Sequence, residues 1–209
     1  MTCILIATRN AHKVAEIRQI LAGDFRFLTT ADFPAAPAAA EDAGTFAGNA
    51  RQKAEGLGVW LAANPQAAPA GAPLFVLADD SGLEVDALGG QPGVHSARFA
   101  AGAANSPDAA NNAKLLRLLR DVPPQNRTAR FRCVLALAAR QGPARLFEGC
   151  CEGRIALAPA GVGGFGYDPL FVPEGCDRSF AELGDEVKNK ISHRARALAA
   201  LRRFLNGVA

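Results

Sequence analysis

Two adjacent carboxylates, Asp79 and Asp80, follow a short apolar run over residues 74–78 and precede Ser81 and Gly82. An uninterrupted apolar run of this length predicts a buried strand. Side chains of this chemistry at the end of a strand are typical of metal-dependent catalysis in α/β proteins. The same four residues are favoured in turns, so the segment by itself equally indicates a simple turn.

A second polar cluster covers residues 8–13, between a predicted strand and a predicted helix. The free N–H groups and the dipole at a helix start favour a phosphate at such a position. Lys13 would add a positive charge, and Asn10 a hydrogen bond. An ordinary strand-to-helix connection is the alternative. The chain contains no GxxxxGK sequence, so a Walker A loop is excluded.

Glu41 and Asp42 form a third cluster and offer further carboxylate oxygens. Mg²⁺ needs oxygen ligands and keeps several waters, so one or two carboxylates together with substrate phosphates suffice to hold it. With Asp79 and Asp80, these residues predict a magnesium site in which a further carboxylate takes a proton from a polarised water. A solvated acidic loop would have the same composition.

Residues 161–169 form a glycine-rich segment that formally matches the dinucleotide-binding pattern GxGxxG. In that fold the pattern follows a strand and opens a helix. Here residues 168–172 predict a turn followed by a strand, which argues against a Rossmann fold. We interpret the segment as a loop that presents Phe165 for stacking on a base and Asp168 for hydrogen bonding to it.

Near the C-terminus, Lys188, His193 and Arg194 converge on the expected start of the last helix. A single histidine is more often a surface or core residue than a ligand-binding one. Its two cationic neighbours favour a contact with a purine carbonyl or a phosphate. Asn49 and Lys53, on the second predicted helix, form a smaller polar cluster.

The elements that position these clusters follow from hydrophobic periodicity and from helix caps. Strands are expected over residues 3–7, 74–78, 83–87, 128–139, 145–152 and 169–172. Helices are expected to begin near Lys13, Thr45, Ser106, Ser179 and Ser192. Ser179 and Glu182 have the spacing of a capping box, and Thr45 is a good N-cap. Residues 34–44 and 64–73 are rich in Ala and Pro and predict loops.

The chain has 209 residues, 49% of them hydrophobic and 21% charged, which suits one large domain or two tightly joined lobes. A net charge of +3 is weak support for a polyanionic partner. No apolar run approaches ~18 residues and no secretory signal is visible, so a membrane span is not expected. Five cysteines without a CxxC pair indicate reduced thiols in the cytosol. Cys3 and Cys133 lie in apolar runs and are predicted core residues.

Taken together, these clusters closely resemble the motifs of the inosine triphosphate pyrophosphatase family. The matching segments occur in the family's order and span nearly the whole chain: residues 8–13, 49–54, 78–83, 89–98, 163–169 and 191–194. Each motif is short, but their common order and spacing form a specific signal.

The resemblance implies an enzyme that hydrolyses ITP, dITP and XTP to the nucleoside monophosphate and pyrophosphate, with Mg²⁺ as cofactor. Such an enzyme keeps non-standard purine nucleotides out of DNA and RNA. The resemblance also implies an α/β fold with a central mixed sheet flanked by helices, and two lobes around an active-site cleft. A cytoplasmic homodimer is expected, with no membrane partner and no stable nucleic-acid partner.

By position, the resemblance also assigns roles to single residues. Asp80 would be the metal-linked general base, with Ser81 beside it on the substrate, and Glu41 or Asp42 would share the metal. The triphosphate would be held by Lys53 and by the segment Thr8, Arg9, Asn10, Ala11, His12 and Lys13, with both lysines acting in catalysis. The base would be recognised by Phe165, Gly166, Tyr167, Asp168, Lys188, His193 and Arg194.

One residue departs from the family's pattern, since Gly48 stands where the family usually has glutamate before an Asn-Ala pair. Thr45 and a glutamate at this spacing would form a capping box. Glycine removes that partner and costs up to ~1 kcal/mol of helix propensity. We therefore expect a weaker helix start beside the acidic loop, without loss of a proposed catalytic group.

Two other functions fit parts of the sequence. One is an enzyme on the same scaffold that cleaves modified pyrimidine triphosphates, which substrate profiling would distinguish. The other is a nucleic-acid-binding module that uses Lys13, Lys53 and Arg194 on phosphates and binds polynucleotides in a salt-dependent way. The small net charge and the carboxylates near these cations argue against the second function.

Overall fold

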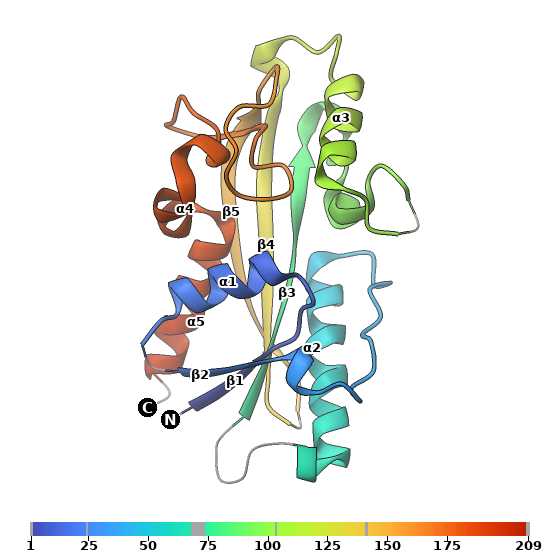
Figure 1. Ribbon diagram of the computed structural model, residues 1–209, viewed down its shortest axis with the longest axis vertical. Coiled ribbons are helices and arrows are strands. Elements are labelled where there is room, and N and C mark those ends of the chain that lie inside the picture. The colour runs from blue at the N-terminus through green and yellow to red at the C-terminus, as the bar shows by residue number, and fades with distance from the viewer. Residues whose placement is uncertain (1, 24, 68–73, 103, 141, 208–209) are drawn as a thin grey trace. The chain divides into compact units, whose positions relative to one another are not determined.

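A sheet of six strands runs through the described part of the chain, shown as a computed structural model in Figure 1. The structure describes residues 2–23, 25–67, 74–102, 104–140 and 142–207. The strands are β1 (Thr2–Ile6), β2 (Phe25–Thr29), β3 (Leu74–Val85), β4 (Thr128–Ala138), β5 (Arg145–Ile155) and β6 (Phe171–Pro173). They lie in the order β2-β1-β3-β4-β5-β6. Because β1 is parallel to β2 and β3, whereas β6 is antiparallel to β5, the sheet is mixed.

The helices that flank this sheet are α1 (Ala11–Ile20), α2 (Phe46–Ala63), α3 (Asp108–Leu118), α4 (Phe180–Ile191) and α5 (His193–Gly207). Short 3₁₀ turns cover residues 30–32, 65–67, 86–88, 93–98 and 124–126. The expected mixed sheet with flanking helices is therefore confirmed. Among the described residues, no helix combines the length and the apolar character needed to cross a bilayer.

The chain groups into two compact units, and each of them is assembled from separate segments. Unit 1 comprises Met1–Asp80, Cys133–Glu148 and Ala197–Ala209, and unit 2 comprises Ser81–Arg132 and Gly149–Arg196. The chain passes between the units inside β3, β4, β5 and α5, so every crossing lies within a regular element. The expectation of a single domain with a cleft stays a prediction.

In unit 1, helices cover both faces of the strands. Ile4 and Ile6 of β1 point into a cluster with Ile17 of α1 and Leu198 of α5. Successive side chains of a strand point to opposite faces, so the buried Cys3 and Leu5 lie on the other face. Figure 1 shows α2 on the side opposite to α1 and α5. Its buried side follows helical spacing through Ala50, Ala54, Leu57 and Leu61.

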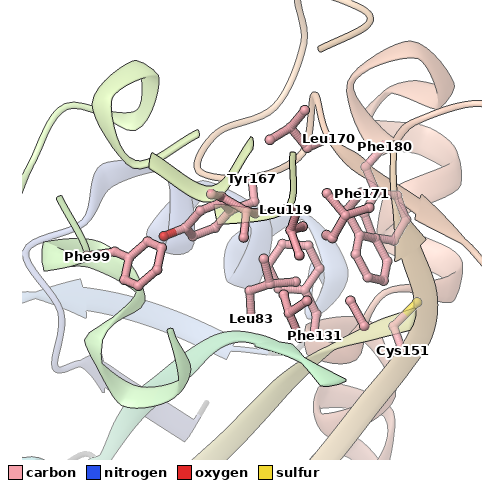
Figure 2. Packing of buried hydrophobic residues seen from close by; sticks show 13 residues of the cluster. Leu83, Phe99, Leu119, Phe131, Cys151, Tyr167, Leu170, Phe171 and Phe180 are labelled. Atoms are coloured by element: carbon pink, nitrogen blue, oxygen red, sulfur yellow. The ribbon is translucent and has the colours of Figure 1, made fainter. Parts of the chain in front are cut away.

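Unit 2 has its own apolar core, which Figure 2 shows from close by. The rings of Phe131, Phe171 and Phe180 lie together, with centroids 4.7 Å apart for Phe131 and Phe171 and 5.4 Å apart for Phe171 and Phe180. Leu119, at the end of α3, packs against the same cluster. This core joins α3, α4 and the strands, and it includes Tyr167, one of the base-recognition candidates.

Several sequence-based expectations about the elements are confirmed. Strands occupy most of 3–7 and 128–139, and β5 includes all of 145–152. Thr45 caps α2 by accepting the Gly48 N–H at 3.0 Å, and Ser179 and Glu182 form the predicted capping box. The Ser192 Oγ accepts the Ala195 N–H at the start of α5. The loop at 34–44 contains no described helix or strand.

Other expectations were wrong. The predicted turn at residues 79–82 does not form, because β3 continues through these polar residues to Val85. The strand β2 was not expected, although Phe25, Phe27 and Leu28 supply its apolar residues. Pro107 rather than Ser106 precedes α3, and no side chain caps that helix. The predicted loop at 64–73 begins with a 3₁₀ turn, and residues 68–73 lie outside the described residues.

Candidate active site

Asp79 and Asp80 lie within β3, and both are almost completely buried. Alternation along the strand directs the two carboxylates to opposite faces of the sheet. Asp79 accepts hydrogen bonds from Lys13 Nζ at 2.6 Å and from Cys133 Sγ at 3.3 Å. Asp80 accepts from Lys53 Nζ at 2.8 Å and from Asn49 Nδ2 at 3.1 Å. Each carboxylate therefore has its own lysine.

The segment before α1 positions Lys13 through a cap. The Asn10 side chain accepts the Lys13 backbone N–H at 3.1 Å, and the Asn10 N–H donates to Thr8 Oγ1 at 3.2 Å. The structure thus brings Thr8, Asn10 and Lys13 together at a helix N-terminus, the arrangement that favours an anion. Arg9, Ala11 and His12 lie exposed in the same turn.

Lys53 links the acidic loop to β3. Its ammonium lies 2.9 Å from Glu41 Oε1 and 2.8 Å from Asp80 Oδ1, so the two carboxylates converge on one positive charge. Asp42 lies apart from this group and accepts a hydrogen bond from Gln52 Nε2 at 3.1 Å. Of the two acidic candidates in the loop, the structure therefore brings Glu41 to Asp80.

Burial and neighbouring charges have opposite effects on the pKa values of Asp80 and Lys53. Burial raises the pKa of Asp80 above the usual carboxyl value, and the charges of Lys53 and Lys13 and the hydrogen bond from Asn49 only partly oppose that rise. Burial lowers the pKa of Lys53, but Asp80 and Glu41 outweigh it, so the pKa of Lys53 is raised. The lysine stays charged, while Asp80 gains affinity for a proton.

The glycine-rich segment of unit 2 is held by Asp168, which is buried. Its Oδ2 accepts the Phe165 N–H at 2.8 Å and the Lys188 ammonium at 2.5 Å. Lys188 Nζ also lies 4.3 Å from the centroid of the Phe165 ring, a cation–π contact. A Cβ at Gly164 would clash with the Asp168 carboxylate, so this position needs glycine. The structure therefore brings together Phe165, Asp168 and Lys188, three of the residues expected to recognise the base.

His193 and Arg194 are the first two residues of α5, and both belong to unit 2. The Arg194 guanidinium donates to Ser81 Oγ at 2.8 Å and lies 5.9 Å from the Phe165 ring centroid. The His193 ring stacks on Phe131 with centroids 4.7 Å apart and is 4% exposed, so one of its faces is covered by the core. Tyr167 points into the core and donates its hydroxyl to the Ser96 carbonyl at 2.8 Å. Arg194 thus joins the group around Phe165. Tyr167 belongs to the core beneath the glycine-rich segment and is anchored there through the Ser96 carbonyl.

Asn49 is a site residue that the sequence analysis placed only in a minor cluster. Its Nδ2 donates to Asp80, and its Oδ1 accepts the Ala43 N–H at 3.0 Å, so one buried amide ties the acidic loop to the carboxylate. Its spacing of four residues from Lys53 put both side chains on one face of α2, and this was the available signal. Cys133 is a core residue as predicted, and its contact with Asp79 was not expected.

The order of these residues along the chain and the fold they occupy match a known family. A model of the Ham1 family matches residues 4–204. The chain belongs to the Ham1 family.

Relatives of this Ham1 chain are similar over almost their whole length. A dITP/XTP pyrophosphatase of Geobacillus kaustophilus is 50% identical, over 95% of this chain and 91% of the relative. A dITP/XTP pyrophosphatase of Opitutus terrae is 48% identical, over 94% of this chain and 95% of the relative. The resemblance found in the sequence is thereby confirmed.

Solved structures agree with the fold. The structure of a HAM1 protein from Coxiella burnetii has a TM-score of 0.84 and 36% identity, covering 99% of this chain and 100% of that one. A nucleoside-triphosphatase / dITP/XTP pyrophosphatase from Mycobacterium abscessus has a TM-score of 0.70 and 42% identity, covering 96% of this chain and 98% of that one.

Proposed function

We propose that this Ham1 protein is a nucleoside triphosphate pyrophosphatase that hydrolyses ITP, dITP and XTP to the nucleoside monophosphate and pyrophosphate. The observation that carries the proposal is the buried Asp80, bonded to Lys53 and Asn49 and joined through Lys53 to Glu41. The relatives named dITP/XTP pyrophosphatase support the substrate class. By removing these nucleotides, the enzyme would prevent their incorporation into DNA and RNA.

Asp80 is the proposed general base. It would take a proton from a water whose oxygen attacks the α-phosphorus of the substrate, while the bond from that phosphorus to the bridging oxygen breaks and pyrophosphate leaves. A raised pKa suits this role, because a carboxylate whose pKa lies closer to neutral pH accepts a proton more readily. Lys53 would offset the negative charge that develops on the phosphate oxygens.

The chain's own donors fit a magnesium ion. Glu41 and Asp80 direct carboxylate oxygens to one positive charge, at present the Lys53 ammonium, and Mg²⁺ needs few protein ligands when phosphates complete its shell. We propose Glu41 and Asp80 as the residues that hold it. Among the described residues, no cluster of three or more acidic, histidine or cysteine side chains offers a fuller cage. When bound, Mg²⁺ would neutralise phosphate charge and polarise water.

Two groups of residues would bind the two ends of the substrate. Lys53 and the segment Thr8, Arg9, Asn10, Ala11, His12 and Lys13 are proposed for the triphosphate, since these residues supply N–H donors and positive charge. Ser81, Phe165, Gly166, Tyr167, Asp168, Lys188, His193 and Arg194 are proposed for the nucleoside. The consecutive residues Asp80 and Ser81 connect the two groups along the chain.

Base selection would follow from hydrogen-bond polarity. A 6-oxo purine presents an acceptor at C6 and a donor at N1, whereas adenine presents the reverse pattern. The Arg194 guanidinium and the Lys188 ammonium are donors only, so they suit a carbonyl and leave an amino group unpaired. Mismatches of this kind can yield discrimination of ~10⁴ or more.

A panel of nucleoside triphosphates with Mg²⁺ tests the proposal, with pyrophosphate and orthophosphate both measured. We expect ITP, dITP and XTP to be cleaved far faster than ATP, GTP and modified pyrimidine triphosphates, with pyrophosphate released. In ¹⁸O-water the label should appear in the nucleoside monophosphate. Release of orthophosphate with a nucleoside diphosphate would refute attack at the α-phosphorus, and a preference for pyrimidines would support the alternative enzyme.

We also propose a cytoplasmic homodimer, which the resemblance to the family supports. Light scattering of the purified protein at several concentrations would test the dimer, because a mass of one chain at all concentrations would contradict it.

A further inference from the structure

Gly166, in the glycine-rich segment of unit 2, has both of its backbone polar groups held by side chains of α3. Its N–H donates to Asp108 Oδ2 at 2.6 Å, and its carbonyl accepts from Asn112 Nδ2 at 2.9 Å. Asp108 and Asn112 are four residues apart, so they lie on one face of the helix. Neither residue was a candidate in the sequence, because both contacts bridge more than fifty positions of the chain.

The local structure of α3 does not account for Asp108. An acidic side chain in the first turn commonly accepts from free N–H groups of its own helix. Here no side chain caps the helix, and the carboxylate accepts an N–H from Gly166 instead. The side chain thus serves another segment of unit 2 rather than its own helix.

Stability does not account for Asn112 either. The residue is 8% exposed, and among the described residues its Oδ1 is a buried atom without a hydrogen-bond partner. An unpaired buried polar atom costs about 1–3 kcal/mol. Leucine would fill a similar volume without that atom, and the carbonyl that would lose its donor belongs to Gly166, which is only half-buried. The contribution that leucine could not make is the hydrogen bond from Nδ2 to Gly166.

Holding Gly166 fixes the residues on either side of it. Gly166 has a φ of +63°, in the left-handed region that glycine adopts readily and other residues rarely adopt. The peptide planes before and after it are shared with Phe165 and Tyr167, so fixing both planes restricts the backbone from which the Phe165 ring projects. That ring contacts Lys188 and Arg194, the two cations proposed for the base.

We infer that Asp108 and Asn112 are positioning residues that hold the Phe165–Asp168 segment through Gly166 and thereby set the preference for 6-oxo purines over adenine. The inference rests on the proposed function. The two side chains act through Gly166, and we assign them no contact with the substrate.

Three variants test the inference: Asn112→Leu, Asp108→Ala and Asp108→Asn. For each, kcat and KM are measured with ITP and with ATP, and Tm is measured alongside. We expect Asn112→Leu to keep or raise Tm while the ITP-to-ATP ratio of kcat/KM falls at least ~10-fold, chiefly through a higher KM for ITP. Asp108→Ala should lower the ratio similarly, and Asp108→Asn should restore much of it because the amide oxygen still accepts the Gly166 N–H.

Asn111→Ala is the matched control, since Asn111 is a buried asparagine of the same helix that bonds Ala97, Ala100 and Ser106 instead of Gly166. It should lower Tm and leave the ITP-to-ATP ratio unchanged. An unchanged ratio in a folded Asn112→Leu, or equal ratios in the two Asp108 variants, would overturn the inference. A wild-type enzyme without activity on ITP would instead overturn the proposed function.

Discussion

At the scale of single residues, the chemistry of this site depends on which partner each carboxylate has. Asp80 is bonded to Lys53 and Asn49, whereas Asp79 is bonded to Lys13 and Cys133. The sequence predicted both aspartates as parts of a magnesium site. Their separate partners follow from β3, which directs neighbouring side chains to opposite faces of the sheet. Asp80 is therefore the proposed base, and Asp79 orients a cation.

Asp80→Asn should lower kcat at least ~100-fold while Tm stays close to that of the parent. Asparagine keeps the shape and can still pair with Lys53, but it cannot take a proton. Steady-state kinetics on ITP together with a thermal melt measure both effects. Activity near the parent level in a folded variant would rule out Asp80 as the base.

Glu41 and Asp42 can be distinguished by the magnesium concentration that activity requires. Glu41→Gln should raise the concentration for half-maximal activity by ~10-fold or more, because one of the two proposed ligands loses its charge. Asp42→Asn should leave it nearly unchanged, since Asp42 contacts Gln52. The reverse result would reassign the metal to Asp42.

The pH dependence of kcat/KM should report Asp80. Burial raises the pKa of Asp80, and the base must be ionised, so activity should be lost as pH falls through that raised pKa. Lys53→Gln removes the strongest opposing charge, which raises the pKa further and moves the acid limb to higher pH. Lys13→Gln should move it less, because Lys13 acts on Asp80 by charge alone. An acid limb that stays in place in Lys53→Gln would contradict this coupling.

At the scale of elements, α2 and β3 assemble the site. α2 carries Asn49 and Lys53 on the face toward β3, and the acidic loop folds back over its first turn. Gly48 permits that fold, since a Cβ there would lie 2.5 Å from Ala43 Cβ. Gly48, where the resemblance leads us to expect glutamate, therefore lies at a close approach between loop and helix.

Replacing each of the three glycines of α2 by alanine should have a different effect, because the added Cβ would meet different surroundings. Gly56→Ala should stabilise the protein by about 0.5–1 kcal/mol, because its Cβ would meet nothing within 4 Å. Gly58→Ala should destabilise it, since the Cβ would lie 2.8 Å from the Ala139 carbonyl oxygen. Gly48→Ala should displace Ala43 and raise the magnesium requirement.

Denaturant unfolding and magnesium titrations of the three variants measure these effects, with Gly56→Ala as the control for a change in helix propensity alone. If Gly48→Ala and Gly56→Ala showed the same magnesium requirement, the loop would not depend on the close approach at Gly48.

The elements also show how far the sequence could lead. Periodicity and caps predicted most helices and strands. The motifs predicted most of the residues that gather around Asp80 and around Phe165. The error at residues 79–82 arose because Asp, Ser and Gly favour turns locally, whereas hydrogen bonding within the sheet and the partners of both aspartates stabilise a continuous strand. Asn112 and Asp108 could not be predicted, because their contacts join segments that are distant in sequence.

At the scale of the whole molecule, three strands and one helix continue from unit 1 into unit 2. Neither unit is a contiguous segment, so neither is expected to fold when expressed alone. Each unit nevertheless has its own core and its own intrinsic probe, Trp60 in unit 1 and Tyr167 in unit 2.

Denaturant unfolding should therefore give coincident transitions from tryptophan fluorescence and from tyrosine difference absorbance. Loss of order in one unit breaks strands that extend into the other, which couples the two cores. Transitions with separate midpoints would show instead that the units unfold independently, and far-UV circular dichroism would then follow both steps.

The alternation of Asp79 and Asp80 across β3 has a consequence for how the site handles protons. Two carboxylates on one face at close range cannot both ionise easily, and they behave as a dyad that shares a single proton. On β3 each neighbour instead pairs with its own ammonium group. A proton taken up by Asp80, the proposed base, would therefore not be shared with Asp79, because the two carboxylates lie on opposite faces of the sheet and bond different lysines.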